Sequence, residues 1–111
     1  MNVTEELHKI AELFEERGKI YGEGYKLKGA VIDALFEKPI ILSTAEDFNR
    51  FSILNYIVGK LVRYSNNFID SGHDDSLDDI SVYAQMLKEL DNEKRIRLSN
   101  LKRKPQELDD A

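Results

Sequence analysis

The chain has 111 residues, with 33% charged and 41% hydrophobic side chains and a formal net charge of -5. This length allows one domain with a modest core and excludes two substantial domains. The absence of cysteine excludes disulfides, thiolate zinc sites and a cysteine nucleophile.

Two helices are predicted in the first forty residues. Residues 4–17 have Thr4 as a candidate N-cap, and Gly18 would end this helix. Its apolar residues recur at helical spacing, as Leu7, Ile10, Ala11 and Phe14. A second helix over residues 24–37 has an apolar stripe of its own and would be ended by Pro39.

The third predicted helix covers residues 43–65 and is apolar on two sides. Ser43 and Glu46 have the spacing of a capping box at its start. One face carries Phe51, Leu54, Val58 and Val62, while Ile53 and Tyr56 belong to the opposite side. Such a helix is typical of the centre of a bundle or of a contact with a second subunit.

A fourth helix is predicted after a polar loop over residues 66–74, with Asp74 or Asp75 as its cap. Leu77, Ile80 and Leu87 lie on its main face, and Met86 adds a second apolar side. The sequence thus predicts an all-α, compact bundle of about four helices. We expect residues 1–93 to form this domain and the third and fourth helices to mediate a homo-oligomer.

The charges are unevenly distributed along the chain. Residues 94–104 carry six basic side chains and no acidic one, whereas residues 1–93 have a net charge of -8. We expect 94–111 to be a basic, then acidic tail that is partly helical or frayed. The acidic body argues against nucleic acid as a partner. A charged N-terminus and the lack of a long apolar run predict a cytoplasmic protein without membrane contact.

Two pairs of carboxylates have the spacing of neighbours on a helix face. These are Glu12 with Glu15 on the first helix and Asp75 with Asp78 on the fourth. If the two helices pack together, the four carboxylates could hold Mg²⁺ beside a phosphate substrate. The alternatives are that the glutamates form a solvated face and that Asp75 only caps its helix.

Further polar side chains on the third and fourth helices are candidates for ligand contact. Lys60 and Arg63 lie one turn apart and could hold phosphate oxygens, or could form a solvated edge. Asp79 borders the apolar face beside Tyr83, which suggests a polar inclusion in a packed interface. The tyrosines could stack on a base, although tyrosines at the edge of a core are more common.

Three short motifs stand in order along the chain, R17-G18-K19-x-Y21-G22, K60-x-x-R63 and H73-x-D75-S76-x-x-D79-I80-x-x-Y83-A84. Together they resemble a family of small phage and prophage proteins in or near the nucleotide-modification-associated domain group, the first of that name. The resemblance covers residues 10–90 and implies a connection with nucleotides in the host cytoplasm. The residues that it implies are Arg17, Tyr21, Gly22, Lys60, Arg63, Asp75, Asp79 and Tyr83.

The carboxylate pairs are also similar to those of the all-α, MazG-like nucleoside triphosphate pyrophosphohydrolases, which bind Mg²⁺ through E-x-x-E and E-x-x-D. In this chain Asp75 stands where the second of these motifs has glutamate. The resemblance to the phage protein family favours Asp79, rather than Asp78, as the other functional aspartate. One hypothesis is therefore a Mg²⁺-dependent (d)NTP pyrophosphohydrolase, with Glu12, Glu15, Asp75 and Asp79 as metal ligands. The alternative is a non-catalytic binder that sequesters a nucleotide signal or inhibits a host defence protein.

Overall fold

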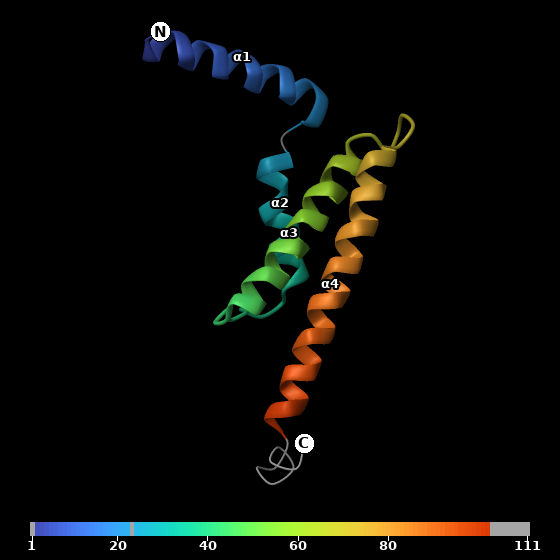
Figure 1. Cartoon of the computed structure of the whole chain (residues 1–111). Coiled ribbons are helices and arrows are strands. Elements are labelled where there is room, and N and C mark those ends of the chain that lie inside the picture. Colours follow the sequence, from blue (N-terminus) through green and yellow to red (C-terminus); the bar gives the residue numbers. More distant parts are fainter. Residues whose placement is uncertain (1, 23, 103–111) are drawn as a thin grey trace.

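The fold is all-α in the computed structural model, which describes residues 2–22 and 24–102. Its four helices are α1 (Val3–Tyr21), α2 (Gly24–Leu35), α3 (Ala45–Ser65) and α4 (Asp74–Leu101) (Figure 1). Within these described ranges there is no strand, so the predicted fold class is confirmed. None of the described helices is long and apolar enough to cross a bilayer.

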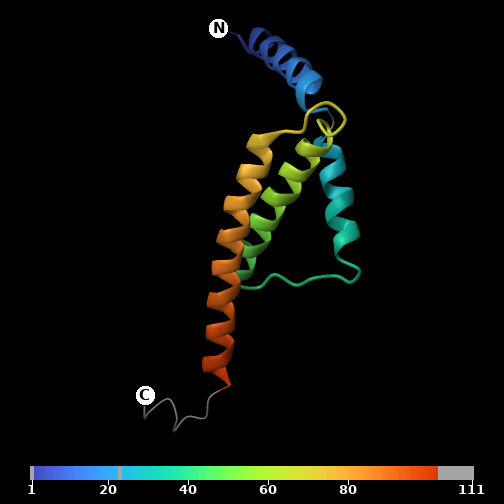
Figure 2. The same cartoon turned by 90° about the vertical axis from the view of Figure 1, so that its right-hand side faces the viewer.

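The helices α3 and α4 form an antiparallel hairpin that is the best-packed part of the molecule. Val58 and Val62 on α3 are 1% and 6% exposed, and Ser76 on α4 is completely buried. Val58 and Val62 belong to the face that the apolar spacing predicts for this helix. Because α4 has 28 residues and α3 has 21, the C-terminal end of α4 continues beyond the end of its partner (Figure 2).

Ion pairs join the start of α3 to the second half of α4. Asp91 accepts a hydrogen bond from Arg50 at 2.8 Å, and Lys94 lies 2.9 Å from Asp47. The hydrogen bond from Lys94 is the main cause of a lowered Asp47 pKa. Similarly, a hydrogen bond to Glu46 raises the pKa of Arg97. These pairs fix the register of the hairpin where α3 has few buried apolar side chains.

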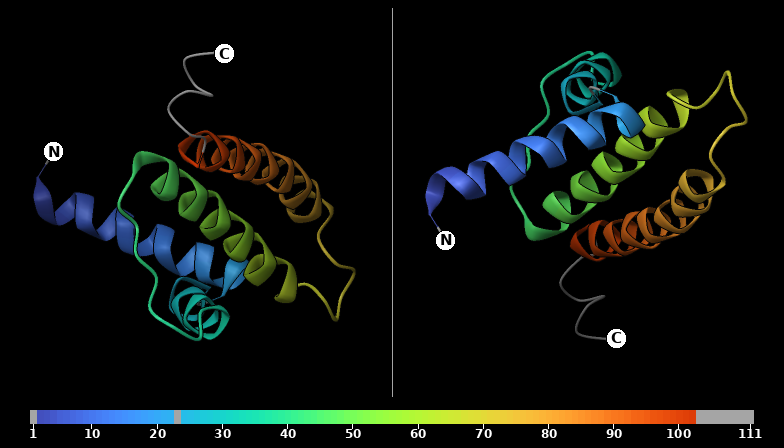
Figure 3. Two further views of the ribbon diagram at one scale, coloured as in Figure 1. Left: turned by 90° about the horizontal axis from the view of Figure 1, so that it is seen from below. Right: turned by 90° about the horizontal axis from the view of Figure 1, so that it is seen from above.

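The short helix α2 packs on the side of α3 that faces away from α4, so α3 lies between the two (Figure 3). Val31 and Ile32 on α2 are half-buried. The ring of Phe36, just after α2, lies 6.2 Å from the ring of Phe51 on α3. Residues 36–44 then cross to the start of α3 without regular helix.

The first helix projects from this body (Figures 1 and 2). Its contact with α2 includes Phe14, whose ring lies 5.9 Å from Tyr25 in an edge-to-face arrangement. The radius of gyration is 20.3 Å, whereas a closed domain of this length has about 13 Å. The arrangement is therefore more extended than the closed bundle that four amphipathic helices suggest, because α1 covers little of the body.

The ends of α1 differ from the sequence prediction. Asn2, not Thr4, is the N-cap, and its side-chain oxygen accepts a hydrogen bond from the amide of Glu5 at 2.9 Å. The helix does not stop at Gly18 but continues to Tyr21. Gly22 ends it with a φ of +67°, a conformation that glycine adopts without the steric cost of a side chain.

The predicted caps of the last two helices are also wrong. Thr44, rather than Ser43, accepts the hydrogen bond from the amide of Asp47, at 3.1 Å. His73, rather than either aspartate, caps α4 through a ring nitrogen that accepts from the amide of Ser76 at 3.2 Å. Asp74 and Asp75 lie in the first turn, where the helix dipole favours negative charge. Each cap is displaced because a neighbouring polar side chain reaches the same free amides.

Candidate functional site

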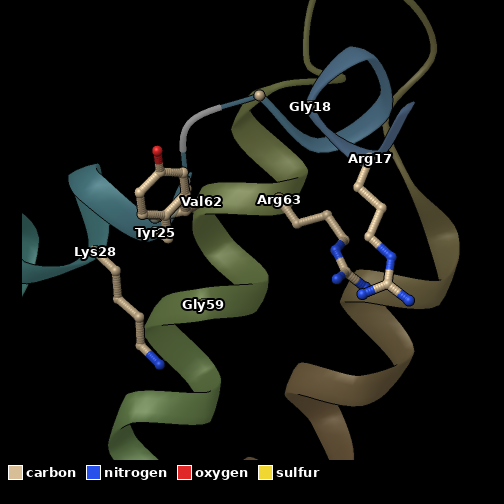
Figure 4. Close-up of a pocket in the computed structure, with 9 residues that line it drawn as sticks. Arg17, Gly18, Tyr25, Lys28, Gly59, Val62 and Arg63 are labelled. Carbon is tan, nitrogen blue, oxygen red and sulfur yellow. The ribbon is translucent and has the colours of Figure 1, made fainter. Parts of the chain in front are cut away.

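A basic pocket lies where the end of α1 and the start of α2 meet the C-terminal part of α3 (Figure 4). Its volume is about 280 Å³, and its lining comes from three helices. Cationic side chains, glycines and one tyrosine dominate this lining, which consists of Arg17, Gly18, Gly22, Gly24, Tyr25, Lys28, Gly59, Val62 and Arg63. We call this site the basic pocket.

Glycines shape the pocket by letting the helices approach one another. A Cβ atom on Gly24 would lie 3.0 Å from the Val62 side chain, so a larger residue would push α2 away from α3. On α3, a Cβ atom on Gly59 would lie 3.7 Å from the Lys28 ammonium group. This is an ordinary van der Waals distance, so the Lys28 side chain lies directly against the Gly59 turn of α3.

Three cations reach the pocket from three different helices. Arg17 comes from α1, Lys28 from α2 and Arg63 from α3. Figure 4 shows the Arg17 and Arg63 side chains extending toward one another, with Lys28 on the other side of the Gly59 and Val62 turns. In the part of the chain that the structure describes, no carboxylate forms an ion pair with Arg17 or Lys28. Like charges repel, so an anion bound between the Arg17 and Arg63 guanidinium groups would be stabilised by both, with Lys28 adding positive charge to the same lining.

Tyr25 adds an aromatic surface at the rim of the pocket. Its side chain is 62% exposed although its ring touches that of Phe14. The Lys26 ammonium group lies 5.7 Å from the centre of the same ring. An exposed ring beside a basic pocket offers a flat surface on which a planar group of a ligand can stack.

The structure brings together two of the five predicted ligand-binding residues, Arg17 and Arg63. Lys60 instead forms a salt bridge with Asp79 at 2.9 Å. Tyr83 stacks on Tyr56, with ring centres 5.3 Å apart. These four side chains connect α3 with α4 outside the basic pocket, so the polar inclusion predicted at Asp79 is a contact within the hairpin.

Tyr21 is the fifth of the predicted ligand-binding residues. Its side chain lies outside the described residues, although its backbone forms the last residue of α1. The neighbouring Gly22 lines the basic pocket. Two of the last three residues of the basic segment, Arg103 and Lys104, also lie outside the described part of the chain.

The four predicted metal ligands do not form one site within a single chain. Glu12 and Glu15 are exposed on α1, whereas Asp75 and Asp79 lie in the first two turns of α4. Asp79 is already paired with Lys60. Among the described residues, no three His, Asp or Glu side chains lie close enough together to hold a metal ion. The described part of the chain therefore does not bring these four carboxylates together as one set of metal ligands.

Sequence reasoning named Tyr25 among the tyrosines that could stack on a base, but it missed Lys28 and the glycines on the two packed helices. A signal was present, since Lys28 lies one turn after Gly24 and therefore shares its helix face. A glycine inside a helix is unfavourable by about 1 kcal/mol relative to alanine and often marks a close contact. Gly24 and Gly59 could have indicated where α2 and α3 meet.

No protein-family model, curated protein or solved structure matches this chain. The resemblance to nucleotide-associated families therefore stays a prediction. A function is therefore inferred from the residues that line the basic pocket.

Proposed function

We propose that this chain binds a nucleotide, or another small molecule with a phosphate group, in the basic pocket. The observation that carries the proposal is that Arg17, Lys28 and Arg63, from three helices, line one cavity, with the Arg17 and Arg63 side chains extending toward one another. Guanidinium groups donate two parallel hydrogen bonds to phosphate oxygens, and lysine adds a compact positive charge. Two arginines and a lysine in one cavity are suited to a multiply charged phosphate.

The size and the rim of the pocket favour a nucleotide over inorganic phosphate alone. Its volume of about 280 Å³ is close to the lower end of the range of small-molecule sites, roughly 300 Å³. This space accommodates the phosphates and leaves the base at the rim, where the exposed ring of Tyr25 can stack on it. Arg63 and Arg17 would then hold the phosphate end of the ligand.

Binding without hydrolysis is the form of the proposal that the geometry favours. The carboxylates Glu12, Glu15, Asp75 and Asp79 lie on two helices, and Asp79 is engaged by Lys60. We therefore place the chain among proteins that hold a nucleotide, as a sequestering protein does. Magnesium-dependent cleavage is the second hypothesis. Mass spectrometry of the ligand after incubation with the protein distinguishes it from binding alone.

The test is a calorimetric titration of the full chain with nucleoside mono-, di- and triphosphates. Arg17→Gln should weaken binding at least about tenfold, since a charge-assisted hydrogen bond contributes about 1.5–3 kcal/mol. Lys19→Gln is the matched control, because it removes the same charge from α1 at a residue outside the pocket lining. It should leave the affinity within about twofold of the original.

Three outcomes contradict the proposal or limit it. If no nucleotide binds, the proposal is wrong. Equal losses from Arg17→Gln and Lys19→Gln would show general charge attraction rather than a site. Mass spectrometry of the ligand after incubation with Mg²⁺ separates the two hypotheses, since an intact nucleotide supports binding and a cleaved one supports hydrolysis.

A further inference from the structure

An apolar stripe runs along α1 and is exposed for most of its length. Val3 is 74% exposed, and Leu7, Ile10 and Phe14 are each 58% exposed. They are spaced by four, three and four residues, the pattern of a helix that packs along another helix. A single helix of 19 residues is only marginally stable in water without such packing. The stripe therefore requires a cover that the rest of this chain does not supply.

A matching apolar groove lies at the other end of the body. Its volume is about 400 Å³, and it is bounded by α3, α4 and residues 36–42. Apolar side chains form most of its floor and walls, namely Phe36, Ile40, Ile41, Phe51, Leu54 and Leu87. Ile41 is 85% exposed, so the groove is open to solvent. Figure 3 shows α2, α3 and α4 side by side. A helix laid along the groove would be a fourth helix packed against this body.

The accessible surface of one chain is large enough for a substantial interface. It measures 9036 Å², whereas a folded monomer of this mass exposes about 6,300 Å². The excess is roughly 2,700 Å², compared with about 800 Å² per partner in a standard interface and more in obligate dimers. Val58 and Val62 are the fully buried apolar side chains among the described residues, a small core for a stable monomer.

The charges of the two surfaces are complementary. α1 carries five acidic and three basic side chains, and residues 94–102 of α4 carry four basic and no acidic ones. The groove lining itself has no net charge, because its two acids pair with its two bases, as Arg50 with Asp91 and Lys94 with Asp47. Lys88 and Arg95 lie one turn before and after Asp91 on α4. Glutamates of α1 would meet these two cations beside the groove.

We propose that α1 of each copy packs into the groove of a second copy of this chain, forming a closed homodimer. Each chain carries both the stripe and the groove, so a two-fold axis satisfies both at once and leaves neither exposed. The groove of the same chain is a poorer match, since the contact of Phe14 with Tyr25 directs α1 away from it. This inference goes beyond the proposed nucleotide site and does not depend on it.

The first test is the mass of the full chain by light scattering at micromolar concentration. We expect the mass of two chains. Ile10→Asp should weaken the dimer at least about tenfold, since it places a charge in the apolar contact. His8→Asp adds the same side chain on the opposite side of α1 and should leave the dimer intact. The mass of one chain, or a dimer that Ile10→Asp does not weaken, would overturn the proposal.

A second test does not depend on the stability of these variants. Because the chain has no cysteine, one preparation can carry Ile10→Cys alone and another Ile41→Cys or Leu87→Cys alone. After mixing and mild oxidation, we expect a disulfide-linked heterodimer of the two preparations. If a double variant instead forms only a disulfide within one chain, α1 occupies its own groove and the proposal is wrong. Cross-linking only between two Ile10→Cys chains would also contradict it.

Discussion

The α3–α4 hairpin and the first helix are built from similar amphipathic sequence but have different environments. In the hairpin, Val58 is 1% exposed and ion pairs such as Arg50 with Asp91 join the two helices. On α1, the corresponding apolar side chains, such as Ile10, remain 58% exposed. The hairpin finds its complementary face within the same chain, and α1 does not.

This difference shows that an apolar stripe specifies that a helix must be covered but not by what. The hairpin has a short connection over residues 66–73, which brings α4 back along α3 with little loss of chain entropy. At the other junction, α1 ends at Gly22 with a φ of +67°, and the helix projects away from the body (Figure 1). The two regions therefore differ more in how their helices are connected than in the amphipathic pattern of the helices themselves.

The largest effect is expected where the hairpin is most buried. Val58→Asp would place an unpaired charge at a fully buried point of the α3–α4 contact. Such a charge costs about 3–5 kcal/mol of stability, enough to unfold a small domain. Thermal melting followed by circular dichroism measures this loss. Val82→Asp on the exposed side of α4 is the control, and an equal loss there would contradict the description of the hairpin.

A smaller effect is expected at the junction that directs α1. Gly22→Ala places a side chain at a φ of +67° and 3.3 Å from the Asn66 amide group, so it should destabilise the chain by about 1–2 kcal/mol. Gly18→Ala is the opposite control, because its Cβ atom would meet nothing within 4 Å. That variant should stabilise α1 by roughly 0.5–1 kcal/mol. Urea unfolding of both variants checks the signs, and destabilisation by Gly18→Ala would contradict the continuous helix.

The smallest effect is expected from the acid titration of the hairpin. The hydrogen bond from Lys94 lowers the pKa of Asp47 below its ordinary value of 3.8. Because the folded pKa is the lower one, this contribution to stability is complete above about pH 4 and is lost as the pH falls through the folded pKa. The urea midpoint should therefore decrease as the pH falls from about 4 through the folded pKa.

Asp47→Asn should make this decrease in the urea midpoint shallower, since the titrating group is removed. Asp33→Asn makes the same chemical change on the exposed side of α2 and should not alter the pH dependence. If both variants retain the full decrease, the Lys94 contact is not its source. The difference between the α3–α4 hairpin and α1 would then lie in apolar packing and not in this ion pair.

Sequence reasoning was most accurate where a pattern is local. The four helices follow from apolar periodicity, and the buried positions Val58 and Val62 follow from the same spacing. Cap positions were wrong by one or two residues, as at Ser43 and Thr44, because several polar side chains compete for the same amides. For the candidate site, Arg17 and Arg63 were identified on short motifs, whereas Lys60 is engaged by Asp79.

The sequence by itself determined that this protein is helical, which faces of its helices are apolar, and that its acidic body precedes a basic segment. These properties depend on spacings of three and four residues and on charge counts, which need no tertiary information. Only the tertiary structure decided that Lys28 joins Arg17 and Arg63 at one pocket, and that Glu12 lies on a different helix from Asp75 without forming a common site. Contacts between helices depend on turn directions and on the absence of a side chain at Gly24, which local periodicity does not encode.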